Sequence, residues 1–169
     1  EITTRLVGSE MCIRDRNKEP EKRGCIYRGK RILLVEDNEL NQEIAQTILE
    51  DAGFMVETAG DGVVAVKKME QAVPGQYDLI LMDIQMPVMN GYDATRAIRR
   101  STHELAKTIP IIAMTANAFS EDIINSRISG MNQHLTKPLE EAKILAELKE
   151  CLSRQESGPG SSESDQKKG

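Results

Sequence analysis

The stretch from Asp78 to Gly91 reads DLILMDIQMPVMNG, and its pattern decides the fold. The apolar run that ends at Asp83 is typical of a strand buried on both faces of a sheet. Pro87 and the pair Asn90-Gly91 are turn signals, so a loop follows the strand. The pattern therefore places one carboxylate at the carboxyl end of a buried strand, where parallel α/β sheets bind their ligands.

Similar apolar runs elsewhere predict four more strands, and helical patterns lie between them. The expected strands are 32–37, 54–58, 78–83, 108–115 and 133–136. Helices are expected after the caps Asn38 and Asp61, and at about 92–100, 120–129 and 140–152. The polar residues of 120–129 predict an exposed, loosely held helix. The expected core-facing residues of the other helices are Leu40, Ile44, Ile48, Ala52, Val63, Val66, Met69, Ala94, Thr95, Ile98, Ala142, Leu145, Leu148 and Leu152.

Five repeats of strand and helix predict an α/β fold, (βα)5, with helices on both faces of a parallel sheet. The common arrangement is the flavodoxin-like doubly wound sheet with strand order 2-1-3-4-5. We expect one domain over residues 30–152, a leader over 1–29 and a disordered tail over 153–169. Residues 1–16 have no structural period and fit either a translated adapter sequence or a natural linker.

Composition excludes several function classes. The chain has 169 residues, no Trp and a net charge of −5, which argues against a broad nucleic-acid surface or a base-stacking platform. No apolar run approaches the roughly 18 residues of a membrane helix. The three cysteines, Cys12, Cys25 and Cys151, show no C-x-x-C spacing. We therefore expect reduced thiols and a cytoplasmic protein.

Polar residues gather at the carboxyl ends of the predicted strands. Glu36 and Asp37 follow the first strand, Asp83 ends the third, Thr115 ends the fourth and Lys137 follows the fifth. In the order 2-1-3-4-5 the first and third strands are neighbours, so the three carboxylates converge. Two like charges about 4 Å apart repel by roughly 4 kcal/mol at an effective dielectric of about 20. The cluster therefore requires either protonation or a bound cation.

Oxygen ligands without nearby His or Cys favour Mg²⁺, which keeps waters that a phosphate can replace. The ammonium of Lys137 and the hydroxyl of Thr115 complete a set of groups that suits phosphoryl transfer. The nucleophile of such a site would be an aspartate that forms an acyl phosphate.

Four phrases carry a family resemblance: ILLVEDN at 32–38, LMDIQMPVMNG at 81–91, MTANA at 114–118 and LTKP at 135–138. Together they make the chain from Lys30 to Leu152 similar to a response-regulator receiver domain of two-component signalling. The wording of the first three, with Asn41-Gln42, is most similar to receivers attached to hybrid sensor histidine kinases.

The resemblance implies roles for particular residues. Asp83 would accept a phosphoryl group from a phosphohistidine on a histidine kinase or histidine-phosphotransfer domain. The Mg²⁺ ligands would be Glu36, Asp37, Asp83 and the backbone carbonyl of Gln85. The phosphoryl-binding and switch residues would be Thr115, Ala116 and Lys137, and the supporting residues Pro138 (after a cis bond), His134, Asn117 and Gln85. His134 stands where many receivers carry an aromatic switch residue, which puts the coupling between Thr115 and that position in doubt.

The resemblance also implies a protein that catalyses its own phosphorylation and dephosphorylation but turns over no external substrate. No DNA-binding or enzymatic output domain is recognised after Leu152, so the chain is expected to be a C-terminal part of a hybrid sensor histidine kinase. A phosphohydrolase of the haloacid dehalogenase type is one alternative, but it requires a second Asp where Gln85 stands. A pseudo-receiver that acts only as an interaction module is the other.

Overall fold

A computed structural model describes residues 27–117 and 119–156, and it confirms the predicted fold class and strand order. Five parallel strands form one sheet in the order β2-β1-β3-β4-β5. The strands are β1 (Arg31–Val35), β2 (Met55–Ala59), β3 (Leu79–Asp83), β4 (Ile111–Thr115) and β5 (Gln133–Thr136). The helices are α3 (Glu39–Asp51), α4 (Gly62–Gln71), α5 (Gly91–Arg100), α6 (Ser120–Ser129) and α7 (Glu141–Glu156).

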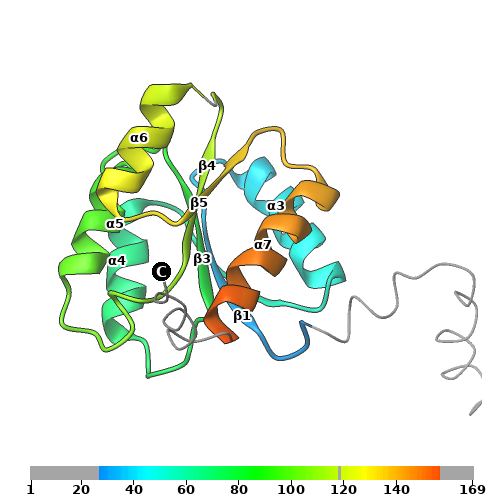
Figure 1. Cartoon of the computed structure of the whole chain (residues 1–169), viewed down its shortest axis with the longest axis horizontal. Coiled ribbons are helices and arrows are strands. Elements are labelled where there is room, and N and C mark those ends of the chain that lie inside the picture. Colours follow the sequence, from blue (N-terminus) through cyan, green and yellow to red (C-terminus); the bar gives the residue numbers. More distant parts are fainter. Residues whose placement is uncertain (1–26, 118, 157–169) are drawn as a thin grey trace, which may run out of the picture.

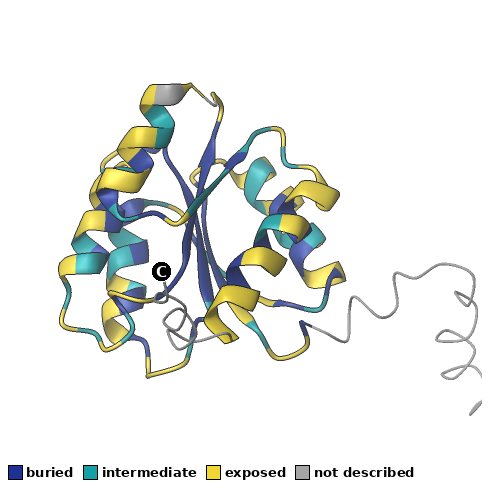
Figure 2. Cartoon of the chain, viewed as in Figure 1, coloured by how far each residue is buried: buried dark blue, intermediate teal, exposed yellow. Residues whose placement is uncertain are grey.

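The sheet separates two hydrophobic cores. Helices α4, α5 and α6 cover one face, and α3 and α7 cover the other (Figure 1). Successive residues of β3 alternate between the cores: Ile80 and Met82 face α4 and α5, whereas Leu79 and Leu81 face α3 and α7. Figure 2 shows the central strands β1, β3 and β4 as buried and the outer helix faces as exposed, whereas the edge strands β2 and β5 are mostly half-buried. Burial on both faces explains why the central strands are continuous apolar runs.

The predicted caps are confirmed, but the predicted face of α3 is confirmed only toward the end of the helix, where Ile48 is half-buried against the core and Ala52 is buried. Asn38 accepts a hydrogen bond from the backbone N–H of Asn41, and Gly53 follows the helix with φ 101°. Leu40 and Ile44, however, are 65% and 46% exposed. The helix turns about 100° per residue, so positions four apart drift by about 40° per step. A stripe with strict four-residue spacing therefore leaves the core, and the buried residues of α3 are Ala45 and Leu49.

Smaller corrections apply to the other helices. In α4 the buried residues are Gly62, Ala65 and Met69, whereas Val63 and Val66 are half-buried. In α7 Ala142 is exposed, and Ile144 and Cys151 join the predicted Leu145, Leu148 and Leu152 in the core. In α6 Ser126 is buried. The face predicted for α5 is confirmed.

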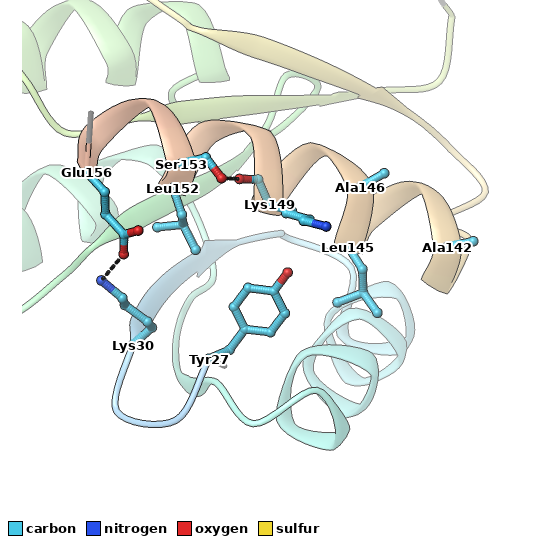
Figure 3. A pocket seen from close by; sticks show the side chains of 9 residues that line it. All are labelled: Tyr27, Lys30, Ala142, Leu145, Ala146, Lys149, Leu152, Ser153 and Glu156. Atoms are coloured by element: carbon cyan, nitrogen blue, oxygen red, sulfur yellow. Dashed lines mark hydrogen bonds and ion pairs between the residues drawn. The ribbon is translucent and has the colours of Figure 1, made fainter. Parts of the chain in front are cut away.

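The folded unit extends past both predicted boundaries. Tyr27, assigned to the leader, is 7% exposed and stacks on Phe54 with ring centroids 4.5 Å apart. Figure 3 shows Tyr27 beneath α7, facing Leu145 and Leu152, next to a cavity of about 380 Å³. Helix α7 continues past Leu152 to Glu156. The remaining leader and tail, with Cys12 and Cys25, lie outside the described residues.

Within residues 27–117 and 119–156, every helix is either too short or too polar to span a membrane.

Candidate functional site

The backbone around Asp83 is held by a close approach that only glycine allows. Asp83 ends β3 and is 2% exposed. A Cβ atom on Gly91 would lie 2.3 Å from the carbonyl oxygen of Asp83, and the N–H of Gly91 donates to the carbonyl of Ile84 at 2.9 Å. Asn90 caps α5 by accepting from the N–H of Asp93. The start of α5 is therefore packed against the end of β3, which fixes where the Asp83 side chain leaves the sheet.

Glu36 and Asp37 follow β1, the strand beside β3. Because Val35 pairs with Met82, the next residues of the two strands, Glu36 and Asp83, end up side by side. Glu36 is 1% exposed, whereas Asp37 is exposed. Carboxylate oxygens of Glu36, Asp37 and Asp83 all lie within 4.8 Å of one another. Sheet order and register thus bring the three predicted carboxylates to one point.

Hydrogen bonds from the start of α3 hold Glu36 in place. Its Oε1 accepts from the N–H of Asn38 at 3.3 Å, and its backbone carbonyl accepts from Nε2 of Gln42 at 3.1 Å. The contribution of Gln42 was not foreseen, although its position one turn after Asn38 is a signal that could have revealed it.

Lys137 bridges the two buried carboxylates. Its Nζ lies 2.8 Å from Oε2 of Glu36 and 3.2 Å from Oδ1 of Asp83. Its N–H donates to the carbonyl of Thr115 at 2.7 Å, and the bond to Pro138 is cis, as the resemblance implied. Burial alone would lower the pKa of Lys137, but hydrogen bonds and charges from the two carboxylates outweigh burial and raise it.

The Asp83 carboxyl is a poor acid in this setting. Burial and the charge of Glu36 raise its pKa to about 7, against the opposing effect of Lys137. The N–H of Gln85 donates to Oδ1 at 3.3 Å, and no described residue donates to Oδ2. Burial thus disfavours the ionised form of Asp83.

The donor set fits a hard divalent cation. Oε2 of Glu36 is buried and has its ion pair with Lys137, but it accepts no hydrogen bond of normal geometry within the described part of the chain. When all are ionised, the three carboxylates and one ammonium leave two uncompensated negative charges. The cluster's ligands are all oxygen, which suits Mg²⁺.

The remaining predicted residues lie at the same edge, but not all of them point into the cluster. Thr115 is 4% exposed, and its hydroxyl donates to the carbonyl of Asn117 at 2.8 Å and accepts from that residue's N–H at 3.1 Å. Ala116, Asn117 and Gln85 are exposed. His134 is half-buried on β5, paired with Ala113 rather than Thr115. The hydroxyl of Thr115 is thus engaged by its own loop.

Comparison with known proteins identifies the family. The family model described as "Response regulator receiver domain" matches residues 32–149. The chain belongs to the response regulator receiver family. This assignment confirms the resemblance drawn from the sequence. The matched range includes all the residues of the carboxylate cluster and every strand except the first residue of β1.

Several histidine kinases contain a similar receiver. Probable histidine kinase 2 of Oryza sativa subsp. indica is 41% identical over 128 residues, covering 69% of this chain and 12% of that protein. The sensor protein GacS of Pseudomonas syringae pv. syringae is 41% identical over 118 residues, covering 69% of this chain and 13% of that protein. The match thus covers about an eighth of the length of each of these two relatives.

Solved receiver structures align with this chain over nearly their whole length. The receiver domain of the sensor histidine kinase PA1611 from Pseudomonas aeruginosa, crystallised with magnesium in its active-site cleft, is 41% identical. It covers 74% of this chain and 98% of its own, with a TM-score of 0.67. The chemotaxis protein CheY4 of Vibrio cholerae is 31% identical and covers 73% of this chain and 98% of its own, with the same TM-score of 0.67.

Proposed function

We propose that this receiver accepts a phosphoryl group on Asp83 and uses the resulting acyl phosphate to change its interactions with partners. One observation carries the proposal. A single ammonium, that of Lys137, lies between two buried carboxylates, 2.8 Å from Glu36 and 3.2 Å from Asp83. Such a costly arrangement of buried charge suits a site that receives further charged groups.

The chemical step is a substitution at phosphorus. Oδ2 of Asp83, which no described residue engages, attacks the phosphorus of a phosphohistidine. The new P–O bond forms as the P–N bond breaks, and the donor's imidazole leaves with the electron pair and takes up a proton. Since burial and Glu36 raise the pKa of Asp83 to about 7, deprotonation of this residue is a condition of attack.

Glu36, Asp37, Asp83 and the backbone carbonyl of Gln85 would hold Mg²⁺. When bound there, the ion supplies positive charge that favours ionised carboxylates and a transferring phosphoryl group. Lys137 is placed to pair with the added phosphoryl charge, because its ammonium already contacts Oδ1 of Asp83. The hydroxyl of Thr115 and the N–H of Ala116 would donate to phosphoryl oxygens once Thr115 leaves its bonds with Asn117.

We also infer that the receiver works within a hybrid sensor histidine kinase and on the cytoplasmic side of the cell, where ATP supplies phosphohistidine. The kinase relatives and the small share of their length that this chain spans support that origin. The donor would be a histidine kinase core or a histidine-phosphotransfer domain. The coding sequence upstream of Lys30 tests the origin, because a kinase core is expected there.

The test of the acceptor uses acetyl phosphate labelled with ³²P and purified chain. The wild type is expected to take up label only with Mg²⁺, in a hydroxylamine-sensitive form typical of an acyl phosphate. Asp83→Asn is expected to take up none. Asp51→Asn, a change of an exposed residue at the end of α3, is the matched control and should label like the wild type.

Three outcomes would overturn the proposal. Label that persists in Asp83→Asn excludes Asp83 as the acceptor. Failure of the wild type to bind Mg²⁺ and beryllofluoride favours the pseudo-receiver alternative. Steady turnover of an aryl phosphate would instead support the phosphohydrolase alternative.

A further inference from the structure

Arg99, near the end of α5, is a half-buried cation whose hydrogen-bond acceptors are all neutral oxygens. Its Nη1 donates to the carbonyls of Ala106 at 2.9 Å and Ile109 at 2.7 Å. Its Nε and Nη2 donate to the carbonyl of Gly130 at 3.0 Å and 2.8 Å, and Nη2 also donates to Oδ1 of Asn132 at 3.0 Å. All five N–H groups are used. No carboxylate of the described residues forms an ion pair with Arg99, so its role is geometric.

These bonds fasten the C-terminal end of α6. Gly130 directly follows α6 in a left-handed conformation, φ 102°, and its N–H donates to the carbonyl of Arg127. The N–H of Met131 donates to the carbonyl of Ser126, which closes the helix. Asn132 continues the attachment, because its Oδ1 also accepts from the N–H of Ile111 at the start of β4. The guanidinium of Arg99 and the side chain of Asn132 thus connect the C-terminal end of α6 to the amino-terminal end of β4.

The N-terminal half of α6 has little to hold it. Its cap residue, Phe119, makes no side-chain capping bond and is 68% exposed. Ile124 and Ile128 are 54% and 70% exposed. Among the described side chains of α6, only Ser126 and Ser129 are buried and Ile123 is half-buried, so no described apolar side chain of this helix is fully buried. One hydrogen bond, from the hydroxyl of Tyr92 to Asp122 at 3.1 Å, joins this half to α5.

The N-terminal half of α6 is the half that connects to the site around Asp83. The hydroxyl of Thr115 bonds both backbone groups of Asn117, in the loop that leads into α6. A phosphoryl group that attracted this hydroxyl would release that loop from Thr115. The change would reach the N-terminal end of α6 first, because hydrogen bonds from Arg99 hold the other end.

We propose that Arg99 is a positioning residue that fixes the C-terminal end of α6, so that the response to phosphorylation is confined to the N-terminal half of this helix. The proposal rests on the proposed function for the phosphoryl-dependent part alone. Fastening by Arg99 is a property of the protein without a phosphoryl group, and it can be measured there.

Amide hydrogen exchange of the whole chain tests both parts, with Mg²⁺ and beryllofluoride as the phosphoryl mimic. In the wild type, peptides over 116–125 should change their exchange rate on adding beryllofluoride, while those over 126–133 should not. Arg99→Lys keeps the charge but supplies one nitrogen in place of three. Without ligand, its amides at Gly130 and Met131 should exchange about tenfold faster, and with beryllofluoride the response should spread into 126–133.

Arg96→Lys is the matched control, since Arg96 lies on the same helix, is exposed and pairs with Asp93 at 3.2 Å, its one ion pair among the described residues. Its exchange should equal that of the wild type. If Arg99→Lys does not fold, Asn132→Ala, which removes one acceptor of Arg99, should give a smaller increase in the same peptides.

If the amides of Gly130 and Met131 exchange as slowly in the variants of Arg99 and Asn132 as in the wild type, Arg99 does not fix the end of α6. If beryllofluoride changes the exchange of the wild type evenly over 116–133, the response is not confined to the N-terminal half of the helix. Failure of the wild type to bind beryllofluoride would refute the proposed function and the phosphoryl-dependent part, whereas the fastening would still be decided by the unliganded exchange rates.

Discussion

Gly91→Ala is expected to destabilise the protein far more than an ordinary glycine substitution. The new methyl group would lie 2.3 Å from the carbonyl oxygen of Asp83, 2.9 Å from the Cα of Ile84 and 3.0 Å from the carbonyl carbon of Asp83. All three atoms belong to backbone, so no rotamer change relieves the overlap. The start of α5 and the end of β3 must therefore separate by about 0.7 Å to restore the 3.0 Å that Cβ contacts require.

This separation moves a strand that is buried on both faces, so its cost lies at the upper end of the range for overpacking, about 3 kcal/mol. For a domain of this size that cost lowers the melting temperature by about 10 °C. Thermal and urea unfolding followed by far-UV circular dichroism measures the effect. Because Asp83 sits at the displaced point, labelling by acetyl phosphate should also slow in the folded variant.

Gly60→Ala is the matched control. Nothing lies within 4 Å of a Cβ atom at Gly60, and its backbone is not left-handed. The added methyl group there should leave stability unchanged or raise it by about 0.5 kcal/mol, through the unfolded state. A melting temperature of Gly91→Ala within about 2 °C of the wild type would refute the close approach as the reason for glycine at this position.

Three further predictions concern charge, strain and the domain boundary. The pKa of Asp83 is about 7 in the folded protein and near 4 in the unfolded chain, so between these pH values the folded state keeps a proton that the unfolded state loses. Ionising Asp83 therefore destabilises the folded wild type as the pH rises, whereas Asp83→Asn has no such group. In urea unfolding without divalent ions, the stability advantage of Asp83→Asn over the wild type should grow between pH 4 and 7 by up to about 4 kcal/mol. Val88 is 88% exposed with φ 70°, an unfavourable conformation for a β-branched residue, so Val88→Asn should gain about 1 kcal/mol in thermal unfolding, whereas the exposed Val73→Asn should gain nothing. Tyr27→Ala removes the stack on Phe54 and should cost about 3 kcal/mol in urea unfolding; an unchanged midpoint would return Tyr27 to the leader.

The spacing of apolar residues and the turn signals at strand ends predicted most of the fold, because both are local properties of the sequence. An apolar run bounded by turn signals identifies a strand wherever it lies, and the sheet order then places Glu36 beside Asp83 without further information. The orientation of α3 was harder to predict, since Leu40 and Ile44 satisfy the helical period as well as Ala45 and Leu49 do. Contact with the sheet selects the second stripe, and that contact is not encoded in the period.

Boundaries failed for a related reason. Tyr27 stands in a charged, glycine-containing stretch whose composition is typical of a linker. Its partner Phe54 is remote in the sequence, and the two rings meet because β1 and β2 lie side by side. A residue whose only reason for burial is a distant partner carries no local signal, so composition assigns it to the wrong side of the boundary.

In the site, too, the sequence predicts where a residue lies better than what its side chain contacts. Strand register places Thr115 at the edge where Asp83 ends, since Asp83 pairs with Met114 and Thr115 is the next residue. What its hydroxyl does there depends on competing partners. Lys137 is held by Glu36 and Asp83, and the hydroxyl of Thr115 forms hydrogen bonds with the backbone groups of Asn117. A phosphoryl group on Asp83 would offer charged acceptors instead, and charge-assisted hydrogen bonds are the stronger kind. The sequence therefore predicts Thr115 as the proposed switch residue, whereas its contact with Asn117 is known only from the structure.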